Sequence, residues 1–159
     1  MKKEETAIQM ILSAWKSQVE SINKTLSVLS DEDLNAEVSP GKNKAFWIVG
    51  HLAAVNDFLF NILELGEKIN PTYAQFFTKG DVRIKTPSVS ETRKYWADTS
   101  TLLTKKMAGF TTDDWFQKHG LVSAEDFLKE PLRNKLNVLL SRTSHIAHHR
   151  GQLVLLEKK

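Results

Sequence analysis

Residues 45–65, AFWIVGHLAAVNDFLFNILEL, carry only two charged side chains, Asp57 and Glu64. The segment stops at Gly66, and glycine is common just past the last turn of a helix because it adopts a left-handed conformation at little cost. A helix that is apolar on nearly every side must be surrounded by protein. The stretch therefore predicts a mostly buried helix against which the rest of the chain packs.

A long amphipathic helix is predicted before this segment, over residues 5–29. Its apolar side chains are three or four positions apart, which places them on one face of a helix. They are Ile8, Ile11, Leu12, Trp15, Val19, Ile22, Leu26 and Leu29. A polar turn follows at residues 30–44, where Ser30 and Asp33 have the spacing that caps a short helical turn.

Residues 67–89 are the least regular part of the chain and contain Pro71, Gly80 and Pro87. Connections of this length are uncommon in compact domains and usually carry function or cross over a bundle. We expect a long irregular connection here. Ser88 and Glu91 then have capping-box spacing, which predicts a third long helix ending near residue 109.

The remaining chain predicts short helices after Thr112 and after Ser123. A last long helix is expected from Pro131, a good first-turn residue, to about Glu157. No internal repeat or linker divides the sequence. The pattern predicts an all-α protein, a four-helix bundle with a long connection between helices two and three, forming a single domain over residues 1–159.

The composition is that of an ordinary globular protein. The chain has 159 residues, 41% hydrophobic and 26% charged, with a net charge of +3. It has no cysteine, which excludes disulfides, zinc-thiolate sites and a cysteine nucleophile and is typical of a reducing compartment. No uninterrupted apolar run resembles a membrane span, and the N-terminus does not resemble a signal peptide. We therefore expect a cytoplasmic protein without a membrane partner.

Nucleic-acid binding is not indicated, although the pI is about 9.1. Lysine and arginine are scattered among acidic residues, and no basic stripe or helix-turn-helix pattern with a basic recognition helix is present. The expected partner is a small-molecule substrate. The sequence leaves open whether the protein forms a homodimer.

His51 lies in the middle of the apolar second helix. At 100° per residue, its neighbours on the same face are all apolar. They are Trp47, Ile48, Ala54, Val55, Phe58 and Ile62. A lone histidine on such a face is more often a hydrogen-bonded core residue than a metal ligand, so His51 by itself decides nothing.

His145 and His149 strengthen the case for a metal. They are four residues apart, which places their side chains on neighbouring turns of one face with Cβ atoms roughly 6 Å apart. Two imidazoles at this spacing can reach one ion at about 2.0–2.1 Å each. The alternative is the solvated polar face of an amphipathic helix. Against it, only Arg142 and Arg150 carry a fixed charge between residues 136 and 156, which indicates a buried helix whose imidazoles need partners.

Other candidates are assigned lesser roles. His148 is 100° from His149 on the helix, so we expect it beside the site or at the surface. His119 precedes Gly120 in a turn and is expected to be exposed. Arg150 projects about 100° away from His149, which favours packing or an ion pair. Asp57 is about 120° from His51 and is not proposed as a site residue.

Two motifs resemble one known family. The run HIAHHRGQL, residues 145–153, and the segment WIVGHL, residues 47–52, resemble the signatures of the DinB/YfiT-like superfamily. The resemblance implies a four-helix bundle with one metal, commonly zinc or nickel, on His51, His145 and His149. Members with assigned activities are similar to metal-dependent transferases that use low-molecular-weight thiols, thiol-dependent isomerases or hydrolases.

Three neutral imidazoles leave a divalent ion with an open position, which is typical of catalytic sites. Water there has a pKa near 7, or a thiol binds as thiolate. We therefore expect a metal-dependent enzyme in which a thiol or water attacks a small organic electrophile, and the thiol must come from outside the chain. The alternative is a non-catalytic metal-binding stress or interaction protein whose ion clips two helices together. The sequence assigns no catalytic residue.

Overall fold

The structure is a computed structural model that describes residues 2–80 and 83–157. Within those residues it contains eight α-helices, one 3₁₀ helix and no strand beyond two isolated bridge pairings, so the protein is all-α. The elements are α1 Lys3–Val28, α2 Asp31–Asn35, α3 Ala45–Ile62, α4 Pro71–Lys79, α5 Val89–Met107, α6 Thr112–Phe116, α7 Ala124–Lys129, α8 Lys135–Leu153 and η1 Val154–Leu156.

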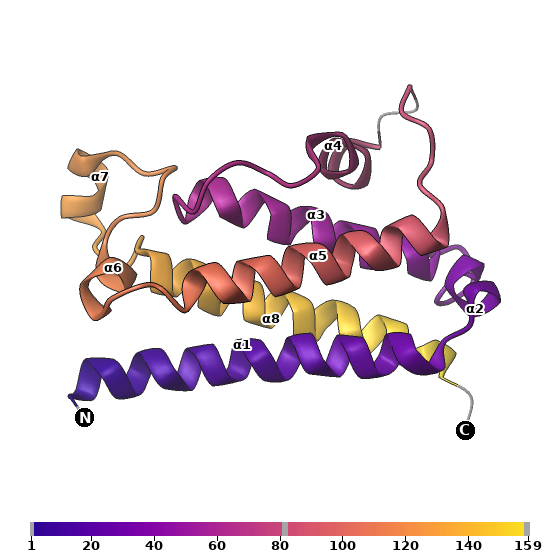
Figure 1. Ribbon diagram of the computed structural model, residues 1–159, viewed down its shortest axis with the longest axis horizontal. Coiled ribbons are helices and arrows are strands. Elements are labelled where there is room, and N and C mark those ends of the chain that lie inside the picture. The colour runs from indigo at the N-terminus through magenta and orange to yellow at the C-terminus, as the bar shows by residue number, and fades with distance from the viewer. Residues whose placement is uncertain (1, 81–82, 158–159) are drawn as a thin grey trace.

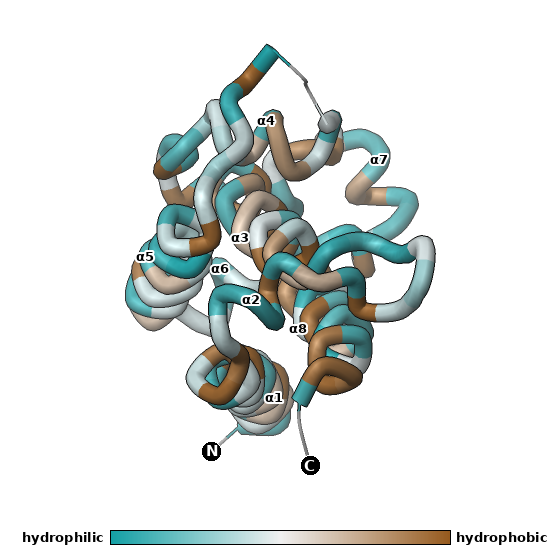
Figure 2. The backbone as a smooth tube through the Cα atoms, turned by 90° about the vertical axis from the view of Figure 1, so that its right-hand side faces the viewer, coloured by the Kyte–Doolittle hydropathy of each residue, from teal (hydrophilic) through white to brown (hydrophobic). Residues whose placement is uncertain are grey.

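Four helices, α1, α3, α5 and α8, are 18 to 26 residues long and lie side by side (Figures 1 and 2). In Figure 1, α1 and α8 run in one direction and α3 and α5 run in the other. Because α3 and α5 are parallel, the chain must travel back along α3 between them. Residues 63–80 and 83–88 belong to that return, and α4 lies on α3 along the way.

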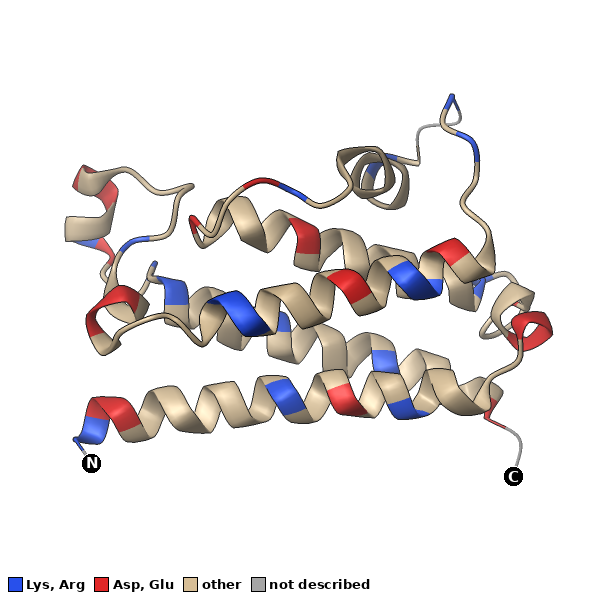
Figure 3. Cartoon of the chain, viewed as in Figure 1, with Lys and Arg blue, Asp and Glu red and all other residues tan. Residues whose placement is uncertain are grey.

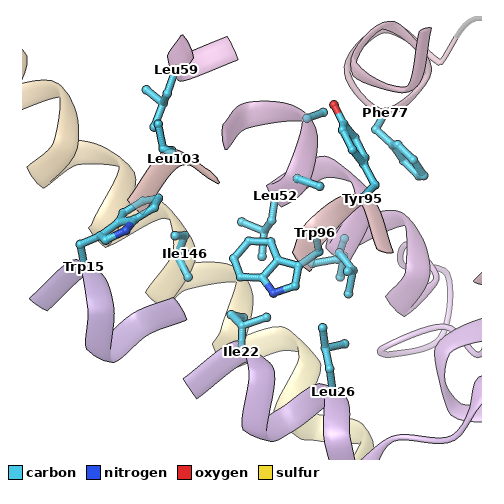
Figure 4. Close-up of a cluster of buried hydrophobic side chains, with 14 of the residues drawn as sticks. Trp15, Ile22, Leu26, Leu52, Leu59, Phe77, Tyr95, Trp96, Leu103 and Ile146 are labelled. Carbon is cyan, nitrogen blue, oxygen red and sulfur yellow. The ribbon is translucent and has the colours of Figure 1, made fainter. Parts of the chain in front are cut away.

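The core lies where the four long helices meet (Figure 4). Trp15 and Ile22 come from α1, Leu52 from α3, Trp96 from α5 and Ile146 from α8, and each is at most 1% exposed. Full burial of an aliphatic side chain such as Leu52 or Ile146 stabilises the fold by about 1.5–3 kcal/mol relative to exposure. The apolar faces expected from the sequence therefore meet in one core.

Capping residues begin three of the helices, and two of these residues, Ser30 and Ser88, were expected from the sequence. Ser30, Ser88 and Thr111 precede α2, α5 and α6, and each hydroxyl accepts a hydrogen bond from the backbone N–H three residues later. The acidic residue at that later position bonds back to the capping residue's N–H. Two donors at each helix start are thereby satisfied. The helices expected after these positions are confirmed.

The prediction that residues 67–89 form an irregular connection is wrong, because helix α4 occupies part of it. The Asn70 side chain accepts a hydrogen bond from the N–H of Tyr73 at 3.0 Å and caps the helix. Pro71 is at its start, and Gly80 ends it in the left-handed conformation at φ 65°. Proline and glycine thus mark a helix start and a helix end here. In a sequence, proline and glycine are equally typical of a loop.

Two helix boundaries also differ from expectation. Helix α8 begins after Asn134 rather than at Pro131. The Asn134 side chain caps the helix by accepting a hydrogen bond from the N–H of Asn137 at 2.9 Å. Helix α3 ends four residues before Gly66. The first left-handed residue after it is Glu64, at φ 60°.

Helix α3 has the length and mean hydropathy of a membrane span, but 61% of it is buried inside the protein. Core helices of globular proteins meet the same two criteria. The helix therefore corresponds to the buried central helix that residues 45–65 predicted.

Helices α3 and α4 make an unusually close contact at Gly50. A Cβ atom added there would lie 2.2–2.4 Å from three ring atoms of Phe77 on α4. Only a residue without a side chain allows the ring to rest on the backbone of α3. Phe77 is 1% exposed, so this contact is part of the core and sets the position of α4.

A buried carboxylate fixes the start of α4 as well. Asp57 of α3 is fully buried and accepts hydrogen bonds from the N–H groups of Ile69 at 2.6 Å and Asn70 at 3.0 Å. The Tyr95 hydroxyl of α5 donates a third at 2.8 Å. Burial, followed by the neighbouring carboxylate, raises the pKa of Tyr95 above its ordinary value. Asp57 therefore joins three segments and has a structural role.

We predict that Gly50→Ala lowers the free energy of unfolding by about 1–3 kcal/mol, the usual cost of overfilling a packed core. Gly151→Ala is the matched control, because Gly151 is also helical but a Cβ there meets nothing within 4 Å. That control should stabilise the protein by roughly 0.5–1 kcal/mol. Urea denaturation of the metal-free variants measures both, and equal effects at the two positions would contradict the close-contact argument.

Candidate metal centre

His51 reaches the site from the central helix α3. Its side chain is half-buried, and its Nδ1 lies 3.2 Å from the backbone oxygen of Phe77 on α4. A carbonyl oxygen can only accept a hydrogen bond, so Nδ1 carries the hydrogen. The lone pair is therefore left on Nε2, the atom that faces away from α4 toward α8.

His145 and His149 reach the same point from successive turns of α8. Their Nε2 atoms are 3.0 Å apart, and the Nε2 of His51 lies 3.4 Å from that of His145. Ligands about 2.1 Å from a tetrahedral ion lie roughly 3.4 Å from one another. The three nitrogens all lie within 4.8 Å of each other. The cluster can therefore hold a metal ion.

Gln152 orients His149. Its Oε1 lies 2.7 Å from Nδ1 of that imidazole. The amide oxygen accepts the Nδ1 hydrogen, which again leaves the lone pair on Nε2. Metal-bound histidines usually donate their second N–H in this way, and such partners fix ring orientation and tautomer. Two of the three imidazoles are thus held in the metal-binding tautomer.

The third imidazole shows why a cation suits this cluster. Two Nε2 atoms present lone pairs to one point, so only His145 can supply a hydrogen there. Its Nδ1 is buried and has no hydrogen-bond partner among the described residues. Without an ion, a single hydrogen on His145 Nε2 must serve two acceptor nitrogens at close range. A divalent cation would satisfy all three lone pairs.

Burial keeps His145 and His149 neutral. It lowers the pKa of His145 to about 4, with further contributions from the charges of His149, His51 and Arg142. Burial also lowers the pKa of His149, against an opposing effect of the hydrogen bond to Gln152. Neutral imidazole is the form that binds metal. At neutral pH, protons therefore compete little for these two ligands.

The remaining histidines lie outside the cluster. His148 is exposed, as expected, with its ring 5.1 Å from that of His149. His119 was expected to be exposed but is partly buried, because the turn folds back and its Nδ1 accepts a hydrogen bond from the N–H of Leu121 at 3.3 Å. Arg150 is partly buried and forms no ion pair within residues 2–80 and 83–157.

The Phe77 carbonyl was not anticipated from the sequence. It belongs to α4, in the stretch expected to be irregular. Every residue has a backbone oxygen, so the residue type does not show which one will contact an imidazole. The signal that was available is Gly50, directly before His51, whose missing side chain lets α4 approach. Gln152 could be identified from the sequence, because it lies on the same face of its helix as His145 and His149.

The fold and site together define an all-α protein with a buried three-histidine cluster that could hold a metal ion. The sequence model of the DinB superfamily matches residues 14–153, which include all three histidines. The chain belongs to the DinB superfamily. No curated protein matches it significantly.

We predict that the purified protein binds about one divalent transition metal per chain. His145→Ala or His149→Ala should weaken metal binding more than about 100-fold. Losing only a residue that hydrogen-bonds to a ligand already lowers metal affinity about 10- to 100-fold. His148→Ala is the control and should retain most of the affinity, because its ring lies outside the cluster. Calorimetric titration with zinc and elemental analysis measure this. Equal damage by all three variants would contradict the assignment.

We also predict that the metal-free protein loses stability as pH falls from about 6.5 to 4. The unfolded chain protonates its imidazoles near the ordinary pKa of 6.5, whereas folded His145 stays neutral down to about 4. In this window the unfolded state binds more protons, so acid favours unfolding. Urea midpoints across the range should fall with pH. His145→Gln should flatten the trend, and His148→Gln, at an exposed position, should not.

Proposed function

We propose that this protein is a metal-dependent enzyme in which a divalent ion on His51, His145 and His149 activates a thiol or water toward a small organic electrophile. The observation that carries the proposal is the convergence of the three Nε2 atoms, with no fourth protein ligand in the cluster found among the described residues. Three protein ligands are typical of catalytic rather than structural sites. When bound, such an ion supplies Lewis acidity that lowers the pKa of water or a thiol beside it.

The protein's own groups prepare the site for that chemistry. The Phe77 carbonyl and the Gln152 amide hold two imidazoles in the required tautomer. All three ligands are half-buried rather than enclosed, so each is partly open to solvent. The low pKa of His145 keeps it available as a ligand at neutral pH.

The surroundings of His51 favour an organic reactant. Trp47 and Phe58 lie on its face of α3 and are both partly exposed. The Trp47 ring is held edge-on by Phe76 and Phe77, with ring centres 5.3 and 5.4 Å away. An apolar wall beside a polar centre is usual in small-molecule sites. It accommodates a carbon skeleton better than a phosphate ester.

Several finer features belong to the same proposal. The ion is zinc or nickel, and the four long helices act as a four-helix bundle whose long second connection carries α4 to the site. Because the chain has no cysteine, any reacting thiol is a separate low-molecular-weight compound. The reaction is then an S-transfer, or a hydrolysis where water replaces the thiol. Such chemistry suits the cytoplasm, where free thiols are kept reduced.

A non-catalytic metal protein is the second candidate. The observation that favours it is the placement of the ligands on two helices, α3 and α8, which an ion would tie together. A purely structural ion would stabilise that contact and exchange slowly. The two candidates differ in whether an outside ligand can reach the ion.

Cobalt substitution separates the two candidates. Adding 2-mercaptoethanol to the cobalt protein should produce a sulfur-to-metal charge-transfer band. His51→Ala should remove the band, and His148→Ala, outside the cluster, should retain it. If neither thiols nor small anions change the visible spectrum of the cobalt protein, the site is closed and the structural role is correct.

A further inference from the structure

A small polar pocket lies beside the first half of α8, where the chain enters this helix. Its volume is about 210 Å³. It is lined by Arg133 and Arg142, with His119, Ser141, two asparagines and one valine, and no acidic residue. The ribbon of α8 in Figure 3 likewise carries the colour of basic residues and not that of acidic ones. The lining is therefore basic and rich in donors.

Arg142 is the unusual residue of this pocket. Its Nε is buried without a hydrogen-bond partner, and no carboxylate pairs with it among the described residues. Two other shielded cations are paired: Lys135 lies 2.7 Å from Glu64, and Arg93 lies 3.2 Å from Asp31. Arg150 also has a buried Nε without a partner, but it lies outside this pocket. A partly desolvated guanidinium is costly without an anion. Burial correspondingly lowers the pKa of Arg142.

The other polar groups show which donors remain available. The side-chain amides of Asn134 and Asn137 already donate to backbone carbonyls. Arg133 lies 3.8 Å from the exposed carboxylate of Glu130. The Ser141 hydroxyl makes no hydrogen bond within residues 2–80 and 83–157, whereas Thr143 and Ser144 bond back to their own helix. Arg142 and Ser141 are therefore the donors that the body of α8 presents to the pocket without an acceptor among the described residues.

The pocket adjoins the histidine cluster. Arg142 precedes His145 by three residues and Ser141 precedes it by four, so all three project from one face of α8. One helical turn, about 5.4 Å along the axis, separates them. This separation is no longer than a small organic molecule, and it is the basis for proposing that one ligand reaches both the pocket and the site of the ion.

We propose that Arg142 and Ser141 bind a carboxylate of the molecule whose other end reacts at His51, His145 and His149. This inference rests on the proposed function and specifies its ligand as a small carboxylic acid with an apolar body. One unpaired cation matches a singly charged anion better than a phosphate dianion. A guanidinium also binds the two oxygens of a carboxylate side by side. Either the electrophile or the attacking thiol can supply this group.

Amide-resolved NMR titration of the zinc-loaded and metal-free protein tests the proposal. Phenylacetate should shift signals of residues 133–142, and the neutral analogue phenylacetamide should bind about tenfold more weakly or worse. This comparison needs no variant. Arg142→Gln should weaken phenylacetate binding about tenfold or more. Arg150→Gln removes the same charge from the same helix outside the pocket, and it should change the affinity by less than about twofold.

A second pair of probes identifies the source of the carboxylate. If 3-mercaptopropionate binds more tightly than 2-mercaptoethanol in an Arg142-dependent way while phenylacetate does not bind, the thiol supplies the carboxylate. If phenylacetate binds in an Arg142-dependent way, the electrophile supplies the carboxylate. Equal affinities for the charged and neutral members of both pairs would overturn the proposal. If thiols and small anions leave the visible spectrum of the cobalt protein unchanged, the proposed chemistry is wrong. Phenylacetate binding to the metal-free protein would then still show whether the pocket binds a carboxylate.

Discussion

The ring of Phe77 rests on the bare backbone of α3 at Gly50, and much of the structure follows from that contact. The parallel arrangement of α3 and α5 forces the chain to return along α3 (Figure 1). At Gly50 this return path comes close enough to be part of the core. The Phe77 carbonyl, held there, meets the Nδ1 of the next residue, His51. Packing at one residue thus sets the tautomer of its neighbour.

A second constraint acts about two turns further along the same face of α3. The Asp57 carboxylate binds the backbone just before α4 and the Tyr95 hydroxyl of α5. Buried without a cation in these contacts, it depends on all three donors. Helix α4 is therefore fixed at its start by hydrogen bonds and along its length by an aromatic ring. This rigidity is what a site that positions imidazoles within a few tenths of an ångström requires.

The metal cluster and the neighbouring pocket share one physical theme. Both contain polar groups that folding has partly removed from water without giving them full protein partners: the three Nε2 atoms of the cluster, and the Arg142 Nε. In a folded domain such groups usually have a partner from outside the chain. One set of groups presents lone pairs, which attract a cation. The other presents positively charged donors, which attract an anion, and the two lie one helical turn apart.

The sequence by itself determined the all-α class, the four long helices and the three candidate ligands. Helical periodicity, capping residues and the four-residue spacing of His145 and His149 are local, so they can be read along the chain. Helix α4 was missed because Pro71 and Gly80 serve equally as loop residues and as helix ends. Only the tertiary structure decided that His51 meets the α8 pair, that the Phe77 carbonyl orients it, and that Arg142 remains unpaired. Those facts depend on which distant segments approach one another, and side-chain packing settles that only when the whole chain has folded.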